Sequence, residues 1–348
     1  MNAAGQSQLN NLQAALQQLD THTPASGQLQ EILAQGFGTL HQPGAGATLQ
    51  RWQALAAVAA HDLSLVKLFE GHTDALAIVA ELGGQTEPQA STQMQRWGVW
   101  AAEMAGIRVM ITPVDGTGVL LDGVKCWCSG AQTVSHGLLT AWHADGSGPQ
   151  LARVAMQQSG VCVSADAWAA VGMAESASVD VRFTQAKAQL VGKPGEYLSR
   201  PGFWQGGAGI AACWYGGALG LGLALQQALH AAPQPARSPF KMAALGKVDL
   251  ALVSTAQALR CAAQWIDDNP LADASALALR VRLAAEQCAK VVLDEAGRAL
   301  GAAAFCRDAR FARAAADLPV FIRQSHAERD FAALADRVIQ AGAASWQL

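Results

Sequence analysis

The chain has 348 residues, of which 51% are hydrophobic and only 15% are charged, so it can bury a large core over two or three domains and is not a disordered protein. Its formal net charge is −3 and no run of Lys or Arg occurs, which excludes the basic footprint of a nucleic-acid-binding protein. The seven cysteines are an odd, scattered set that argues against a disulfide framework, and the N-terminus lacks the pattern of a secretory signal, so we expect reduced thiols and a cytoplasmic protein.

Three zones follow one another in composition. Residues 1–95 are rich in Ala, Leu and Gln at helical spacing, most clearly over residues 49–82. Residues 96–195 are rich in Val, Thr, Trp and Gly with frequent turn signals, and the stretches LLTAWHA, LARVAM and SVDVRFTQA read as strands. Residues 196–348 return to the helical pattern. We therefore predict an α+β fold with an N-terminal helical domain, a compact β domain and a C-terminal helical bundle.

The longest uncharged segment spans residues 201–236 and consists largely of Ala and Gly. About 20 apolar residues can cross a bilayer, but this segment contains Gln226, Gln227 and His230. We predict a helix packed on all sides by other helices, and no membrane partner. The GAGIAA stretch that begins at Gly207 matches a dinucleotide fingerprint only in letters, because no strand precedes it, and we expect close helix packing there.

The strand-like stretch LDGVKCWCSG, residues 121–130, places Cys126 and Cys128 on either side of Trp127. Residues i and i+2 of a strand share a face, so one metal could contact both thiols. Zinc needs four ligands, however, and no second Cys or His pair has ligand spacing. We expect no metal site, and we interpret the cysteines as small buried hydrophobic residues.

Three arginines, Arg307, Arg310 and Arg313, recur at i, i+3 and i+6 and predict one basic helix face. That face is suited either to clamping phosphates or to pairing with acids such as Asp308 in solvent, and the sequence leaves both interpretations open.

Several motifs resemble those of the acyl-CoA dehydrogenase family. The stretch LDGVKCWCSGAQTVSHGLLTA is similar to the family's strand–turn–strand L-x-G-x-K-x-W-I-T/S-N/G-A/G, and GMAESASVDVRF is similar to its G-M-R-x-T-x-S run, although Ala174 replaces the usual Arg. WGVWAAE, RSPF and RALGAAAFCRDAR resemble three weaker family motifs. The resemblance covers roughly residues 50–315. It implies the family's fold, in which a β-barrel-like domain (residues 96–195) lies between helical domains of residues 1–95 and 196–348.

The resemblance also implies FAD as the cofactor. Trp127 would cover the flavin ring and offer an aromatic face to a flat heterocycle, and Ser129 would bind near flavin N5. The backbone of Trp100, Ala101 and Ala102 would run beside the pyrimidine part of the ring.

The family's self-association and partners are implied in the same way. Arg237, in a motif with Phe240, would reach the FAD pyrophosphate across an interface of a homodimer or homotetramer built by the C-terminal bundle. An acyl-CoA would be the substrate, and an electron-transfer flavoprotein or a similar protein would accept the electrons.

The usual catalytic base is missing. Removal of the substrate α-proton needs a buried carboxylate of raised pKa. Most family members carry a Glu eight residues after the Asp of R-D-A-R/K, where this chain has Ala316. A minority carry it early in the central bundle helix, where this chain has Ile210 and no acid nearby.

Two acids are candidates for a relocated base. Asp317 lies one residue beyond the usual position, a rotation of about 100° on a helix, and a break before Pro319 would turn it inward. Glu328 ranks second. The main interpretation is an FAD-dependent α,β-dehydrogenation of an acyl-CoA thioester with hydride transfer to flavin N5. The alternative is a non-catalytic flavin- or CoA-binding subunit or scaffold of the same fold. A flavin monooxygenase would dispense with the acid, but no positive feature of the sequence supports it.

Overall fold

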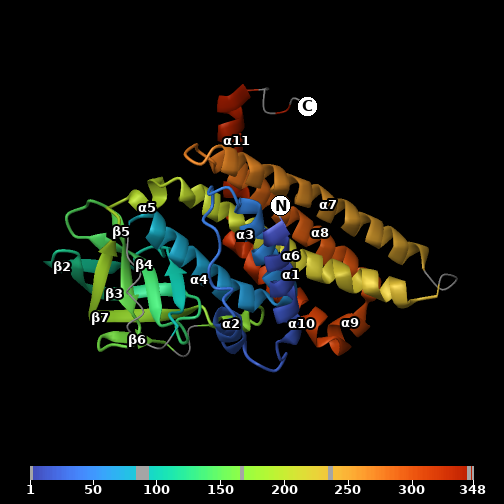
Figure 1. The fold of residues 1–348 in the computed structure, drawn as a ribbon, viewed down its shortest axis with the longest axis horizontal. Coiled ribbons are helices and arrows are strands. Elements are labelled where there is room, and N and C mark those ends of the chain that lie inside the picture. Colours follow the sequence, from blue (N-terminus) through green and yellow to red (C-terminus); the bar gives the residue numbers. More distant parts are fainter. Residues whose placement is uncertain (1–2, 84–93, 165–167, 234–237, 343–345, 347–348) are drawn as a thin grey trace.

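The computed structural model describes residues 3–83, 94–164, 168–233, 238–342 and 346. Helices, strands and a second set of helices follow one another along the chain (Figure 1), which confirms the predicted fold class. The N-terminal helices are α1 (Ala3–Gln18), α2 (Ala25–Ala34), α3 (Thr48–His61) and α4 (Leu63–Glu81). The strands are β1 (Trp97–Trp100), β2 (Val109–Asp115), β3 (Gly118–Cys128), β4 (His136–His143), β5 (Pro149–Ala155), β6 (Val161–Val163) and β7 (Val179–Val191), with the short helix η1 (Ala174–Ser176) before β7. The C-terminal elements are α5 (Glu196–Ser199), α6 (Gly202–Ala231), α7 (Pro239–Asp268), α8 (Ser275–Leu300), α9 (Ala302–Arg307), α10 (Ala309–Phe321), η3 (Ile322–Gln324) and α11 (Glu328–Ala341).

The helical stretch over residues 49–82 is divided at Asp62. This residue leaves the helical conformation, and its side chain accepts a hydrogen bond from the backbone N–H of Leu65 at 2.7 Å. A carboxylate at this position satisfies one of the unpaired N–H groups that begin every helix. The cap therefore starts α4 in a new direction immediately after α3 ends.

The strands form a closed β-barrel. The sheet order is β1-β4-β2-β3-β7-β5, and an additional pairing of β4 with β5 closes it, while β6 pairs with β7 outside the ring. Alternate residues point inward, and Leu121, Leu139, Ala152 and Phe183 belong to the buried interior. Strand β1 pairs with β4 on one side only and lies against α4, where Nδ1 of His72 accepts a hydrogen bond from the Trp97 N–H at 3.3 Å.

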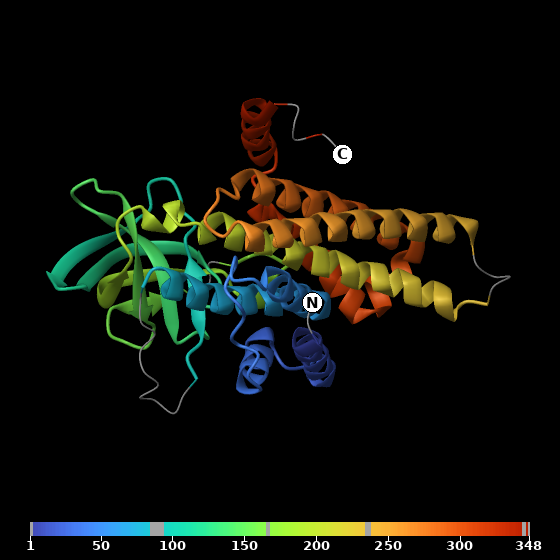
Figure 2. The ribbon, with the colours of Figure 1, turned by 45° about the horizontal axis from the view of Figure 1, so that its top comes forward.

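The uncharged segment forms α6, the central helix of the bundle, packed by α3, α7 and α8 (Figure 2). Both α6 and α7 have the length and hydropathy of a membrane-spanning helix, but α6 is mostly buried by its neighbours, as a core helix is. Its close approach to α3 occurs at Gly216, where a Cβ would lie 2.3 Å from the carbonyl oxygen of Ala56. The close helix packing expected for the GAGIAA stretch is confirmed at Gly209, where a Cβ would lie 3.3 Å from Nε1 of Trp52 on α3, whereas a Cβ on Gly207 would meet nothing within 4 Å.

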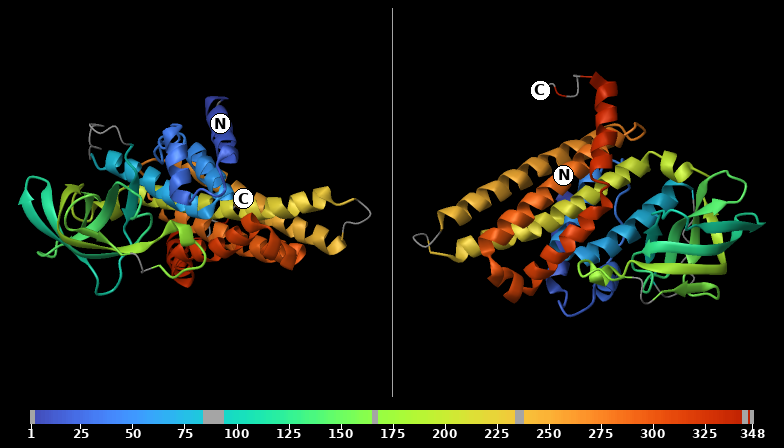
Figure 3. Two further views of the ribbon diagram at one scale, coloured as in Figure 1. Left: turned by 90° about the horizontal axis from the view of Figure 1, so that it is seen from below. Right: turned by 180° about the vertical axis from the view of Figure 1, so that it is seen from behind.

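Two C-terminal helices leave much of their surface uncovered. Helix α7 exposes Phe240, Leu250 and Val253 along its length. Helix α11 stands away from the body (Figures 1 and 3), and among its side chains only Asp330 is buried. Within the part of the chain that the structure describes, nothing covers these three side chains of α7 or the exposed apolar side chains of α11.

Candidate functional site

The end of β3 turns Trp127 outward. The register between β3 and β7 shifts between Lys125 and Cys128, and Trp127 has a φ of 57°. This backbone conformation is uncommon for a bulky residue and marks a position where function is worth seeking. The irregularity leaves the indole 47% exposed, whereas Cys126 and Cys128 are buried. The cysteines are buried as predicted, and no group of three or more His, Cys, Asp or Glu among the described residues is placed to hold a metal.

Trp100 ties β1 to the turn that follows β3. Its indole is buried and donates from Nε1 to the carbonyl oxygen of Ser129 at 3.1 Å. The ring lies where a Cβ on Gly137 would approach it to 2.2 Å, so only glycine fits at that position of β4. Ala101 is half-buried and Ala102 is exposed just beyond. The structure thus brings the two predicted cofactor-binding segments to the same end of the β domain.

An ion pair between the buried Lys125 and the partly exposed Glu103 also joins these segments. Lys125 is 3% exposed, and its Nζ donates to Glu103 Oε1 at 2.7 Å and to Thr140 Oγ1 at 2.7 Å. Burial lowers the pKa of the Lys125 ammonium, and the Glu103 carboxylate opposes this effect. Burial acts to raise the pKa of Glu103, but the hydrogen bonds from Lys125 and Thr140 outweigh it and lower that pKa. The pair holds the segment after β1 against β3, two residues before Trp127.

Three serine hydroxyls form a chain that leads inward from the same turn. Ser129 Oγ lies 2.7 Å from Ser178 Oγ, which lies 3.1 Å from Ser176 Oγ. Ser176 Oγ then donates to the carbonyl oxygen of Met173 at 2.8 Å. Ser176 and Ser178 are buried, while Ser129 is half-buried. A hydroxyl at the protein surface is therefore connected to a buried peptide carbonyl.

Asp317 is buried beside this chain. Its Oδ1 accepts a hydrogen bond from the backbone N–H of Met173 at 2.5 Å, and its Oδ2 has no hydrogen-bond partner. Burial raises the pKa of Asp317 to about 6, against the Met173 hydrogen bond, which lowers it. The predicted break before Pro319 is wrong, because Pro319 lies inside α10. The inward orientation results instead from the packing of Gly172, whose Cβ would lie 2.0 Å from the carbonyl oxygen of Ala316.

The prediction of one basic helix face is wrong, because Arg307 is the last residue of α9 and Asp308 leaves the helical conformation to cap α10. The two arginines on α10 make structural contacts. Arg310 donates to the carbonyl oxygen of Ala60 at 2.9 Å, where α3 ends. Arg313 pairs with Glu175 at 2.8 Å and lies 3.6 Å from Asp62. These contacts favour the paired face over the phosphate clamp.

The other predicted site residues lie elsewhere. Glu328 is the first residue of α11 and is exposed. Phe240 is 87% exposed. It lies at the start of α7, at the end of the folded molecule away from the β domain (Figure 1). Arg237 lies outside the described residues. The structure therefore does not bring Phe240 to Trp127 within one chain, and its role across a subunit interface stays a prediction.

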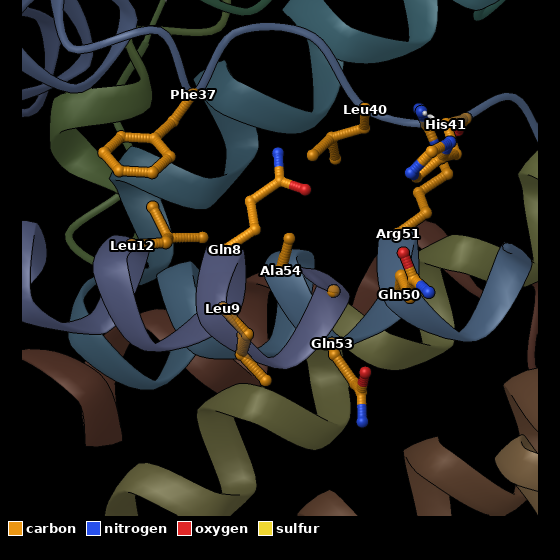
Figure 4. Close-up of a pocket in the computed structure, with 11 residues that line it drawn as sticks. Gln8, Leu9, Leu12, Phe37, Leu40, His41, Gln50, Arg51, Gln53 and Ala54 are labelled. Atoms are coloured by element: carbon orange, nitrogen blue, oxygen red, sulfur yellow. Dashed lines mark hydrogen bonds between the residues drawn. The ribbon is translucent and has the colours of Figure 1, made fainter. Parts of the chain in front are cut away.

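Two hollows lie away from Trp127. The first, lined by Leu12, Phe37, Arg51 and neighbouring residues of α1, α3 and the α2–α3 connection (Figure 4), has a volume of about 30 Å³. It has room for no more than one or two waters. The second, of about 490 Å³, is lined by residues such as Arg153 and Lys187 near the opposite end of the β3–β7 pair.

Sequence reasoning missed two parts of the site. The signal for the ion pair is the spacing of Lys125 and Trp127 on one strand, together with an acid directly after the first strand. The serine chain has a weaker signal, two serines at i and i+2 shortly before β7 begins. Neither signal specifies which atoms meet.

No protein-family model and no curated protein sequence matches the chain. Solved structures do match it. KijD3, solved with FMN and a dTDP-linked amino sugar, is 18% identical over 94% of this chain and 91% of its own, with a TM-score of 0.77. FMN-bound TdsC from Paenibacillus sp. A11-2 is 17% identical over 95% of each chain, with a TM-score of 0.78.

A steroid acyl-CoA dehydrogenase variant, Tcur3481-Tcur3483, is 16% identical over 97% of this chain and 99% of that one, with a TM-score of 0.71. The chain has the acyl-CoA dehydrogenase fold. MsuC from Pseudomonas fluorescens, a methanesulfinate monooxygenase, shares it at 18% identity over 98% of each chain, with a TM-score of 0.75. At these identities the likeness establishes the fold, and function depends on the site.

The residues at the end of β3 fit a flavin ring. Trp127 offers an exposed indole, and the half-buried Ser129 hydroxyl lies two residues beyond it. An aromatic face beside a short polar group suits a flat heterocycle that carries a hydrogen-bonding ring atom.

Proposed function

We propose that the protein is a flavin-dependent oxidoreductase. The ring system stacks on Trp127, and its N5 lies at the Ser129 hydroxyl. FMN is the flavin we favour over FAD, because KijD3 was solved in complex with FMN and TdsC in an FMN-bound form. The cofactor is identified by denaturing the protein and separating the released FMN or FAD by chromatography.

Within this class we propose an oxygenation of a small organic molecule. We favour oxygenation over dehydrogenation because neither candidate base is placed to remove a substrate proton. Asp317 is held by the Met173 backbone, and Glu328 is exposed on α11. A reduced flavin supplies the electrons that activate molecular oxygen, and that chemistry needs no carboxylate at a substrate α-carbon. Two proteins that share the fold are named as monooxygenases, TdsC for dibenzothiophene and MsuC for methanesulfinate.

The chain's own residues have positioning roles in this proposal. Trp127 orients the ring by stacking. The ties from Trp100 to Ser129 and from Lys125 to Glu103 hold the two binding segments together, so that little reorganisation accompanies binding.

Acyl-CoA dehydrogenation is the second candidate, and one observation favours it. Asp317 combines a pKa raised to about 6 with a buried Oδ2 that has no partner. A carboxylate in such a dry position has the properties of a general base.

The two reactions separate in one experiment. We expect no flavin bleaching when acyl-CoAs of several chain lengths are added anaerobically. We expect ¹⁸O from ¹⁸O₂ in the product when the chemically reduced protein meets indole, dibenzothiophene or methanesulfinate. Bleaching that is lost in Asp317→Asn would establish the dehydrogenase instead. A purified protein that stays colourless and binds neither FMN nor FAD would overturn both and leave the scaffold.

Self-association through α7 completes the proposal. Phe240, Leu250 and Val253 are exposed on this helix, whose other side packs against α3, α6 and α8. A second copy of the chain is the occupant we propose, as a homodimer or homotetramer. This arrangement would also bring the start of α7 to the β domain of the neighbouring subunit.

A further inference from the structure

The hydrogen bonds that link the hydroxyls of Ser129, Ser178 and Ser176 have a fixed order of donors and acceptors. Each hydroxyl carries a single proton and can donate only one hydrogen bond. Ser176 Oγ donates to the carbonyl oxygen of Met173 at 2.8 Å, and a carbonyl oxygen can only accept. The 3.1 Å contact between Ser176 and Ser178 then needs Ser178 as its donor. The 2.7 Å contact between Ser178 and Ser129 needs Ser129 as its donor for the same reason.

The carbonyl oxygen of Met173 is the acceptor at which the series of serine hydroxyls ends. Besides the hydroxyl, Met173 O accepts hydrogen bonds from Trp168 Nε1 and from the Ser176 N–H, both at 3.1 Å. The shortest of the three bonds is the one from the hydroxyl. Ser176 and Ser178 are 1% and 7% exposed, so water does not compete readily for their protons. Hydrogen bonds in such a chain polarise one another and reinforce a common direction.

We infer that Ser178 and Ser176 are positioning residues that commit the Ser129 proton inward, so that Ser129 presents an acceptor, not a donor, to the ring nitrogen beside it. This inference rests on the proposed flavin site. Flavin N5 accepts a hydrogen bond in the oxidised ring and donates one in the reduced ring. An acceptor at Ser129 therefore binds the reduced flavin more tightly than the oxidised flavin and raises the midpoint potential of the bound cofactor.

The test is the midpoint potential of bound FMN, measured against reference dyes for wild type, Ser178→Ala and Ser178→Thr. Without Ser178 the Ser129 proton is free to donate to oxidised N5, so the preference for reduced flavin falls. One hydrogen bond of ordinary strength corresponds to a change of about tenfold, which a two-electron couple registers as a potential lower by about 30 mV. Ser178→Thr keeps the hydroxyl and is expected to match wild type.

Ser176→Ala provides a second measurement on the next link and keeps the test valid if Ser178→Ala fails to fold. We expect it to shift the potential in the same direction by a smaller amount. A higher potential in Ser178→Ala would show that the chain runs outward, and an unchanged potential in both alanine variants would show that it has no influence; either result overturns the inference. A wild-type protein that binds no flavin would instead refute the proposed function.

Discussion

The variant Asp317→Asn measures how much the ionised Asp317 carboxylate, buried where α10 contacts Met173, lowers the free energy of unfolding. The amide retains an oxygen that can accept from the Met173 N–H, but it cannot ionise. The pKa of Asp317 is raised by burial from 3.8 to about 6, so the folded state binds more protons than the unfolded state between these values. The contribution of Asp317 to the free energy of unfolding is therefore highest at low pH and falls as the pH rises from 3.8 to about 6.

The size of the effect follows from the shift. Each pKa unit is worth about 1.36 kcal/mol, so the rise from 3.8 to about 6 makes ionisation of Asp317 in the folded protein cost roughly 3 kcal/mol. We expect Asp317→Asn to be more stable than wild type by roughly 3 kcal/mol at neutral pH and equal to it below pH ~4.

Urea unfolding at both pH values measures this difference. Asp317→Ala is the matched control, because it removes the charge but leaves the buried Met173 N–H without a partner, and it is expected to be less stable than Asp317→Asn at either pH. An Asp317→Asn protein that is less stable than wild type at neutral pH would refute the reasoning. It would show that the ionised carboxylate is stabilised by Arg313 and the Met173 N–H more than burial destabilises it.

Three further predictions concern the β domain and α7. Trp127→Ala is expected to weaken FMN binding by about 1–3 kcal/mol in a fluorescence titration, with Trp127→Phe close to wild type, and equal affinity in the alanine variant would place the ring elsewhere. Glu103→Gln is expected to destabilise the fold more than Lys125→Met in denaturant unfolding, because the glutamine leaves the buried Lys125 ammonium without its countercharge. In Lys125→Met the remaining Glu103 carboxylate is about one-third exposed and can be hydrated by water, and the reverse order of stability would contradict this account. Leu250→Arg places a charge on the exposed face of α7 and is expected to lower the mass found by light scattering to that of one chain, while a wild type that is already monomeric would remove the proposed interface.

The order of helices and strands could be predicted because composition and periodicity change sharply near residues 96 and 196. Burial of α6 followed from its lack of charge. The exposure of Trp127 agrees with strand alternation, which places it on the face opposite the two buried cysteines, but alternation does not predict its φ of 57°. That conformation depends on a register shift against β7, a partner that begins more than 50 residues later.

Asp317 shows why the rest could not be predicted. Its position on α10 was expected to need a helix break at Pro319, but the helix continues. The contact that turns the carboxylate inward comes from the β6–β7 connection, where Gly172 lets the chain approach α10 closely. Helical periodicity specifies a direction on one element and carries no information on what a distant loop brings to it.

The closed barrel and the contact between His72 and Trp97 also restrict how this protein can associate. A free strand edge is a template for adding a strand from another chain. Among the described strands, closure leaves only β1 and the three-residue β6 at an edge. On β1 the Trp97 N–H is already bonded to His72, whose pKa burial lowers to about 4, so the ring stays neutral and able to accept at physiological pH. Strand addition at β1 is thus disfavoured, which leaves helical surfaces such as the exposed side of α7 for the proposed self-association.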